Sequence, residues 1–150
     1  MNISDTGLSL IKSFEALRLT PYRDSNGYWT WAWGHKQGPH ETIPASVTSD
    51  DAESILVTDV SFAVQDVNSL IVTDIEQTIF DALTSFLFNV GLTQLRAQPH
   101  RTMSAIQAHD WKATCTAMLR WDHDDRGNVV AGLYNRRVRE TNLILKGVYA

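Results

Sequence analysis

The sequence predicts an α+β fold that is mainly helical, with one β-hairpin among amphipathic helices. Apolar side chains recur at helical spacing over most of the chain, whereas one short segment is rich in aromatic and β-branched residues. The chain has 150 residues, of which 43% are hydrophobic. This length and composition suit a single domain with its own core.

The first expected element is an amphipathic helix over residues 4–17. Its apolar positions are Leu10, Ile11, Phe14 and Leu17, and their spacing predicts a helix that ends near Glu15. We expect Glu15 on the last turn, on the same side as the apolar stripe. Partial burial there favours the protonated form of a carboxyl group, which a general acid at neutral pH requires.

A β-hairpin is expected next. Ser25, Asn26 and Gly27 form a strong turn signal, and residues 28–33 are typical of a strand. Asp24 then precedes the turn and Thr30 lies on the returning strand. We expect both to face a cleft whose other wall carries Glu15.

The rest of the chain is predicted to be helical. Thr48 to Asp51 fits a helix-start box, and a one-faced apolar series follows it. Residues 75–90 are apolar on nearly every side, which predicts a buried helix. Shorter helices are expected near 102–108 and 110–119, with a final one over about 133–146. The only cysteine, Cys115, is expected in the core.

Glu15, Asp24 and Thr30 supply side chains of the types that glycoside hydrolysis uses. This reaction needs one carboxyl group to protonate the leaving oxygen and a second to activate water or to stabilise positive charge on the sugar. The segment FEALRLTPYRDSNGYWTWAWGH supplies both carboxyl groups and a hydroxyl within one helix-to-hairpin unit.

This segment resembles the catalytic segment of the phage-type lysozymes, the endolysin muramidases. DALTSFLFNVG, residues 81–91, is similar to the central helix of that family, and RWDHDDRGNVVAGLYNRRVRE, residues 120–140, resembles its C-terminal region. The resemblance implies one lysozyme-like domain. Its small, hairpin-containing lobe spans about residues 15–55, and a long helix joins it to a helical lobe of about 70–150 plus the N-terminal helix.

The resemblance also implies site residues. Glu15, Asp24 and Thr30 are the expected catalytic residues, and Phe88 and Asn89 are expected to line the saccharide cleft, although Phe88 equally fits the core. Arg136 is expected to pair with Glu15, while its spacing also fits a surface pair with Glu140. Burial and a pair with Arg136 act on Glu15 in opposite directions, so its charge state stays open.

His35 is expected to support the site through hydrogen bonds rather than to bind zinc, because no partner with ligand spacing lies near it. We expect no metal and no cofactor.

Two departures from the family pattern stand out. Trp31, Ala32 and Trp33 stand where family members usually carry an aliphatic residue, a glycine and an aliphatic or aromatic residue, and the two indoles are expected to reshape the cleft wall. The segment after Gly91 lacks a further glycine and carries Pro99, so a different loop is expected at the cleft edge.

The expected function is therefore hydrolysis of the β-1,4 bond between N-acetylmuramic acid and N-acetylglucosamine in peptidoglycan, with inversion, for host lysis by a phage or prophage. Inversion requires carboxyl groups roughly 6.5–9.5 Å apart, and a nucleophilic Asp24 requires about 5–5.5 Å. A lytic transglycosylase, which uses one acid and leaves an anhydro sugar, and a peptidoglycan-binding module without turnover are the alternatives.

Peptidoglycan is the expected partner of a monomeric protein. The net charge of −4 disfavours nucleic acid, although residues 111–150 carry seven basic against four acidic side chains. Apolar runs are too short for a membrane span, and no signal segment is evident at the start. We expect synthesis in the host cytoplasm, no stable membrane association, and action in the periplasm or wall after a separate holin-like protein permeabilises the membrane.

Overall fold

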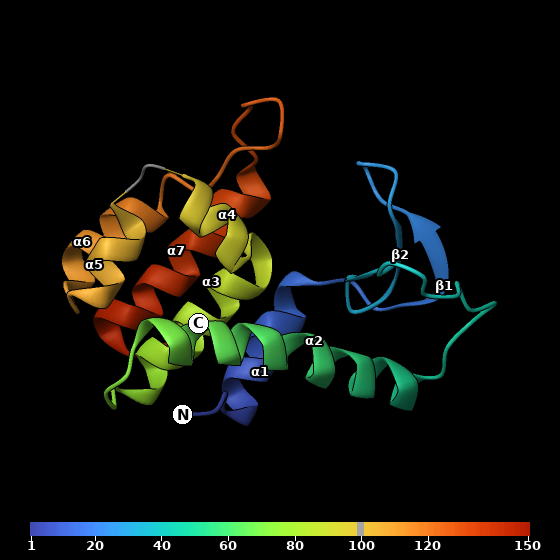
Figure 1. Cartoon of the computed structure of the whole chain (residues 1–150), viewed down its shortest axis with the longest axis horizontal. Helices are drawn as coiled ribbons and strands as arrows, with labels where there is room; N and C mark the ends of the chain where they lie inside the picture. The colour runs from blue at the N-terminus through green and yellow to red at the C-terminus, as the bar shows by residue number, and fades with distance from the viewer. Residues whose placement is uncertain (99–100) are drawn as a thin grey trace.

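The computed structural model describes residues 1–98 and 101–150 and shows a mainly helical α+β fold with a small antiparallel sheet (Figure 1). The predicted fold class is confirmed. The sheet lies beside one end of the long helix α2 (Ser49–Leu70), and most other helices gather around its other end. The two-lobe division at about 15–55 and 70–150 stays a prediction.

Helix α1 (Asp5–Phe14) begins at Ser4, whose side chain accepts a hydrogen bond from the N–H of Gly7. The helix ends at Phe14, just before Glu15 and within the expected range of 4–17. Glu15 is its C-cap, with an extended backbone (φ −104°, ψ 148°), so the prediction that Glu15 lies on the last turn is wrong. The reason is that strand β1 starts at Arg18, and the chain must become extended before it.

The predicted hairpin is formed by β1 (Arg18–Arg23) and β2 (Trp29–Ala32), which pair antiparallel. Gly27 has a φ of +84° in the connecting turn, and its N–H donates to the carbonyl of Asp24. A third strand, β3 (His35–Lys36), adds to β2. It was not predicted, because two residues are too few to show an alternating pattern.

Helix α2 joins the sheet to the other helices. Its N-terminus carries the predicted capping box, in which Thr48 and Asp51 each accept from the other's backbone N–H. The expected apolar face is buried at Leu56, Val60, Ala63, Val67 and Leu70. Trp31 is 2% exposed and packs between the sheet and Ala52 of this helix. Its indole therefore fills a core instead of reshaping a cleft wall, whereas Trp33 is partly buried and donates to Glu53.

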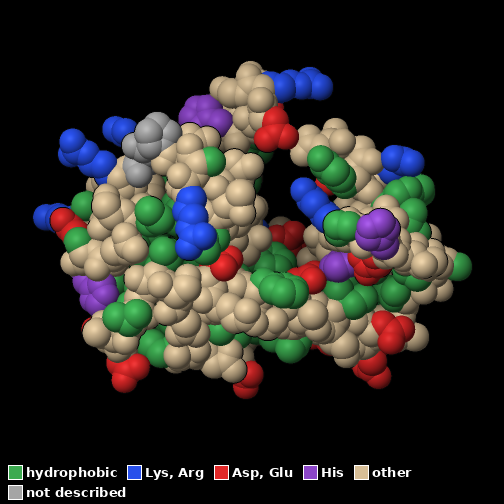
Figure 2. Space-filling model, viewed as in Figure 1, with side chains coloured by type: hydrophobic (Ala, Val, Ile, Leu, Met, Phe, Trp, Pro, Cys, Tyr) green, Lys and Arg blue, Asp and Glu red, His purple; other side chains and the backbone are tan. Residues whose placement is uncertain are grey.

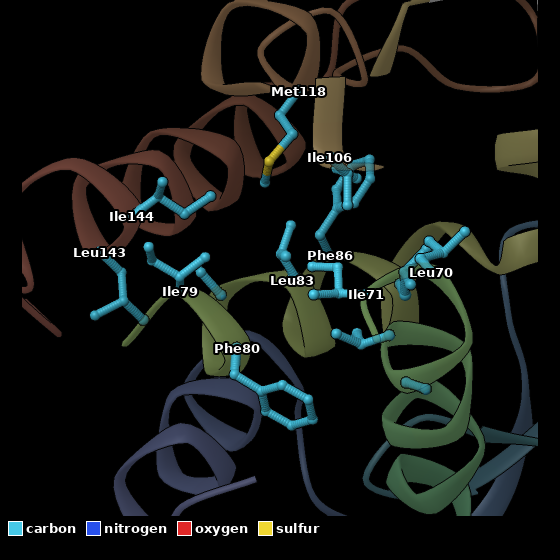
Figure 3. Packing of buried hydrophobic residues seen from close by; sticks show 14 of the residues in the cluster. Leu70, Ile71, Ile79, Phe80, Leu83, Phe86, Ile106, Met118, Leu143 and Ile144 are labelled. Atoms are coloured by element: carbon cyan, nitrogen blue, oxygen red, sulfur yellow. The ribbon is translucent and has the colours of Figure 1, made fainter. Parts of the chain in front are cut away.

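Helix α3 (Gln77–Val90) is the buried helix that the sequence predicts, and it packs against α1, α2 and α7 (Ala131–Lys146). Its side chains form the centre of the main core. Figure 3 shows Ile79, Leu83 and Phe86 of α3 near Met118, Leu143 and Ile144 of the later helices.

The later helices α5 (Thr102–Gln107), α6 (Trp111–Met118) and α7 confirm the three that were expected, within a few residues. A further helix, α4 (Leu92–Ala97), occupies most of the segment expected to be a loop. Pro99 lies outside the described residues. Cys115 is buried as expected, and burial raises the pKa of its thiol to about 11.

In the described part of the chain, no helix combines the length and the apolar character that a membrane span requires.

Gly7 offers a test of the packing between α1 and α3. A Cβ at Gly7 would lie 2.5 Å from the carboxyl carbon of Asp81, which is fully buried and accepts from Ser4, Gln77 and Tyr149. We expect Gly7→Ala to lower the free energy of unfolding by about 1–3 kcal/mol, because the added methyl group overpacks this site. Denaturant unfolding monitored by circular dichroism measures the change.

Gly132→Ala is the matched control, since Gly132 also lies in the first turn of a helix and a Cβ there meets nothing within 4 Å. Alanine's higher helix propensity should leave its stability unchanged or raise it by up to about 1 kcal/mol. Equal stabilisation by both substitutions would contradict the packing described for Gly7.

Candidate active site

Glu15 lies where three parts of the chain meet. Its Oε1 accepts a hydrogen bond from Nη1 of Arg136 in α7 at 2.8 Å. On the other side, a Cβ on Gly34 would lie 2.8 Å from Oε2, and Gly34 has a φ of +81°. Gly34 is therefore required both for the β2–β3 turn and for the close approach of that turn to the carboxyl group.

Asp24 is held rigidly in the β1–β2 turn. Its Oδ1 accepts from the backbone N–H groups of Asn26 and Tyr28, each at 2.9 Å, and Lys36 Nζ lies 3.6 Å from Oδ2. Burial acts to raise the pKa of Asp24, but the two N–H groups and Lys36 outweigh it and lower the pKa below its ordinary value. Asp24 is therefore a carboxylate at neutral pH.

Thr30 lies in the middle of the sheet and is 3% exposed. It pairs with Tyr22 of β1 and Lys36 of β3, and its hydroxyl donates to the carbonyl of Tyr28 at 3.1 Å. Asp24 and Thr30 thus share one hairpin, as predicted, and the next turn of the same sheet touches Glu15 through Gly34. The convergence of all three on one cleft stays a prediction.

Arg136 makes both of the contacts that the sequence left open. Besides its bond to Glu15, its Nε donates to Oε1 of Glu140 at 3.1 Å, and Nη2 donates to the carbonyl of Ser85. Its guanidinium also lies 4.7 Å from the ring centre of Phe14. The expected pair with Glu15 is thus present, and because Arg136 is 4% exposed its pair with Glu140 is buried, whereas the alternative interpretation placed it at the surface.

The sequence did not reveal Arg137 as part of the site, and it offered Glu140 only as a surface partner of Arg136. Both are fully buried, and Arg137 Nε lies 2.9 Å from Oε2 of Glu140. Ser85 also donates to Glu140, and Arg137 Nη2 donates to Oδ1 of Asn89 at 2.9 Å. Burial lowers the pKa of Arg137 to about 10, against the attraction of Glu140. The only sequence signal was the spacing of these residues on one helix, which resembles an ordinary surface charge pattern.

His35 has the hydrogen-bonding surroundings that were expected. Its Nδ1 lies 2.8 Å from Asp59 of α2, and its Nε2 lies 3.0 Å from Glu41. The bond to Asp59 is the main cause that raises the pKa of His35 to about 9, with burial opposing and Glu41 adding to the rise. His35 is therefore a cation at neutral pH that ties β3 to α2. Among the described residues, no group of three or more His, Cys, Asp and Glu side chains is arranged to hold a metal ion.

A cavity of about 1310 Å³ lies between the hairpin turn and the helices. Ser25 and Asn26 line one side, and Asn89 at the end of α3 lines another, together with the turn at 123–127. Figure 2 shows a hollow on this face of the molecule, between the part that carries the sheet and the helical part. Glu15, Asp24 and Thr30 are not among its lining residues, although Ser25 directly follows Asp24.

The structure separates the two residues expected to line the saccharide cleft. Asn89 is exposed and lines the cavity, whereas Phe88 is partly buried and packs against two core clusters. The packing of Phe88 favours the core interpretation.

Comparisons with known proteins agree with this geometry. The family model for phage lysozyme matches residues 12–140. The chain is 37% identical over 150 residues to an endolysin of Bacillus phage B103, covering 98% of this chain and 55% of that protein. An endolysin of Bacillus phage PZA is 34% identical, with 98% and 56% covered. The chain therefore spans about half the length of these two relatives.

Two solved structures are similar over nearly their full length. The endolysin from Escherichia coli O157:H7 phage FAHEc1 has a TM-score of 0.88 and 32% identity, and the alignment covers 100% of this chain and 97% of that chain. The muramidase domain of SpmX from Asticaccaulis excentricus has a TM-score of 0.84 and 32% identity, with 97% and 98% covered.

The contacts of His35 predict a pH-dependent stability. Its pKa is raised from 6.5 to about 9 in the folded state, so its stabilising effect is complete below about pH 6.5 and is lost as the pH rises through about 9. We expect His35→Asn to lower the free energy of unfolding by on the order of 1–3 kcal/mol at pH 6, and by less at pH 9.5. Denaturant unfolding at a series of pH values measures the difference.

His40→Asn serves as the control, because His40 is exposed and has a φ of +64°, which asparagine tolerates. Its effect should be small at every pH. A destabilisation by His35→Asn that stays constant from pH 6 to 9.5 would show that the charge of His35 is not what stabilises the fold.

Proposed function

The chain belongs to the phage lysozyme family, and on this premise we propose that it is a muramidase that hydrolyses the β-1,4 bond between N-acetylmuramic acid and N-acetylglucosamine in peptidoglycan. The names of its relatives, endolysins and a muramidase domain, support this substrate and a role in host lysis. The observation with the greatest weight is the bond between Arg136 and Glu15. It joins residues 121 positions apart and fixes one carboxyl oxygen next to the sheet that carries Asp24.

Glu15 is the proposed general acid. Because its Oε1 accepts from Arg136, the proton that it transfers to the leaving oxygen is carried on Oε2. Oε2 is also the oxygen nearest Gly34, so the proton lies on the side of the carboxyl group that faces the sheet. The side chain of Glu15 is 22% exposed, so the proposed acid is partly buried and still partly accessible.

Asp24 is the proposed base, and Thr30 is proposed to help it position water. The two backbone bonds to Oδ1 leave Oδ2 of Asp24 to accept a proton from the attacking water. The hydroxyl hydrogen of Thr30 is committed to the carbonyl of Tyr28, so its oxygen accepts a second hydrogen from the same water. A water molecule that donates both of its hydrogens to these two acceptors keeps its lone pairs free, and one of them attacks the sugar.

This assignment leads to inversion, because the water attacks from the face opposite to the acid. It requires a separation of roughly 6.5–9.5 Å between the carboxyl groups, rather than the 5–5.5 Å of a retaining enzyme. We propose that no metal or cofactor takes part, and that the glycan lies between a small lobe at about 15–55 and the helical lobe, in contact with Asn89.

The two rival functions explain fewer of these features. A lytic transglycosylase needs one acid, and gives no reason for a carboxylate locked in its ionised form at Asp24 with Thr30 on the same hairpin. A binding module without turnover gives no reason to hold Glu15 against a buried arginine.

We propose further that the protein acts as a monomer on the wall, and does not bind nucleic acid or associate stably with a membrane. In this proposal it is made in the host cytoplasm and reaches the periplasm or wall through a separate, holin-like permeabilising protein.

Replacing the proposed acid tests the reaction itself. Digestion of purified peptidoglycan by the wild type should release saccharides with reducing muramic acid ends, as detected by mass spectrometry. Glu15→Gln is nearly isosteric and keeps an oxygen for Arg136, so it should fold but lower the rate by at least about 100-fold, because it has no proton to give.

Glu53→Gln is the control, since Glu53 of α2 pairs with Lys12 of α1, accepts a hydrogen bond from Trp33, and has no proposed role in the reaction. It should retain the wild-type rate. Anhydro ends in the wild-type products would instead establish a transglycosylase, and binding without any release would establish a binding module.

The export proposal predicts that expression of this chain alone in a bacterial cytoplasm does not lyse the cells. Co-expression with a membrane-permeabilising protein should produce lysis, because the enzyme then reaches the wall. Culture turbidity measures both, with Glu15→Gln as the inactive control. Lysis by the chain alone would refute the need for a partner.

A further inference from the structure

Asn89 stands at the border between the cavity and the buried ion pairs. It is the penultimate residue of α3, it is exposed, and it lines the 1310 Å³ cavity. On the side that faces the interior, its Oδ1 accepts a hydrogen bond from Arg137 Nη2 at 2.9 Å. One side chain therefore contacts the interior and the cavity together.

The contact with Arg137 decides which way the amide of Asn89 points. A guanidinium group has only donors, so the atom that faces it must be the amide oxygen. The amide nitrogen lies on the other side of the planar group and is thus turned away from Arg137. Since Asn89 is exposed and lines the cavity, we infer that its NH₂ group is a hydrogen-bond donor at the cavity wall.

Arg137 is itself fixed in place. It is fully buried, its Nε lies 2.9 Å from Glu140, and its guanidinium lies 4.9 Å from the ring centre of Phe86. Any rotation that breaks the contact with Glu140 leaves the buried charge of Arg137 without its ion pair, which is strongly unfavourable. Arg137 therefore presents its Nη2 to Asn89 in one orientation.

We propose that Arg137 is a positioning residue that aims the NH₂ group of Asn89 into the cavity, where it donates to an amide carbonyl oxygen of the bound wall polymer. The proposal rests on the proposed muramidase function and deepens it, because it assigns the chemistry of one substrate contact. A neutral donor matches a neutral carbonyl oxygen, which peptidoglycan carries both in its N-acetyl groups and in its stem peptides.

Glu140 connects this contact to the proposed acid. The same buried carboxylate binds Arg137, which holds Asn89, and Arg136, which holds Glu15. Through these two arginines of α7, the position of Asn89 is fixed relative to Glu15. The buried ion pairs therefore determine where a sugar bound at Asn89 lies relative to the proposed acid.

A double-mutant cycle tests the positioning role, with soluble, un-crosslinked glycan strands as substrate. Asn89→Ala removes the donor, and Arg137→Lys keeps the charge but loses the fork that reaches both Glu140 and Asn89. Each single variant should raise KM roughly five- to tenfold, the effect of losing about one hydrogen bond, with kcat changed less than threefold. In the Asn89→Ala background, Arg137→Lys should raise KM no further. An additional rise of the full size would overturn the proposal, because Arg137 would then act independently of Asn89.

Asn89→Asp removes the NH₂ donor but keeps the contact between residue 89 and Arg137. Its carboxylate still accepts from Arg137, so the unfolding temperature should not fall, but its outer oxygen cannot donate, and KM should rise at least as much as with alanine. Gln94→Glu is the control, since it adds the same charge to the wall of the same cavity. An equal rise in KM with Gln94→Glu would assign the effect to charge and overturn the donor role.

Nuclear magnetic resonance of the side-chain amide of Asn89 distinguishes failure of this inference from failure of the proposed function, because it needs no turnover. In the wild type the NH₂ group should be ordered, and Arg137→Lys should make it mobile. An equally mobile amide in the wild type would overturn the positioning role, even if the protein hydrolyses peptidoglycan.

The same resonance identifies the acceptor in titrations of Glu15→Gln protein. A shift with the tetramer of N-acetylglucosamine assigns it to N-acetyl groups, and a shift only with peptide-bearing strands assigns it to the stem peptide. Either result supports the donor role, and no shift with either ligand overturns it.

Discussion

The pairing of Glu140 with two arginines is the interaction on which the rest of the candidate site depends. Charged groups are costly to bury, and remain charged in the interior only when they are paired and hydrogen-bonded. Here Glu140 pairs with both guanidinium groups, and Ser85 donates a further hydrogen bond to it. These contacts allow α7 to bring two arginines against α3, and each arginine extends to a residue of the candidate site, Arg136 to Glu15 and Arg137 to Asn89.

The sheet depends on a second set of contacts. Three short strands are marginally stable alone, so they need a surface to pack against. Trp31 provides apolar contact with α2, and His35 provides a charged link to Asp59 on the same helix. These contacts fix the β2–β3 turn, which allows Gly34 to approach Glu15 so closely. The geometry around the proposed acid therefore combines an arginine from the helical side with a backbone turn from the sheet side.

Much of the local structure was predictable, because it depends on neighbours in the chain. In the predicted turn before Tyr28, Asp24 accepts hydrogen bonds from backbone groups within five residues of it. The predicted capping box at Thr48 starts helix α2. Predictions failed where local signals were weak. The end of α1 before Glu15 follows from the start of β1, and α4 replaced a predicted loop because the segment after Gly91 has good helix formers without a periodic apolar face.

The sequence by itself determined the mainly helical fold, the hairpin, and the residue types and spacing of Glu15, Asp24 and Thr30, since periodicity and turn chemistry act over short distances. Only the tertiary structure decided that Arg136 binds Glu15 and Glu140 together, that Arg137 reaches Asn89, and that Trp31 is core. These contacts join residues that lie far apart in the chain. Whether a charged or aromatic side chain is buried depends on what packs over it, and no pattern of neighbouring residues carries that information.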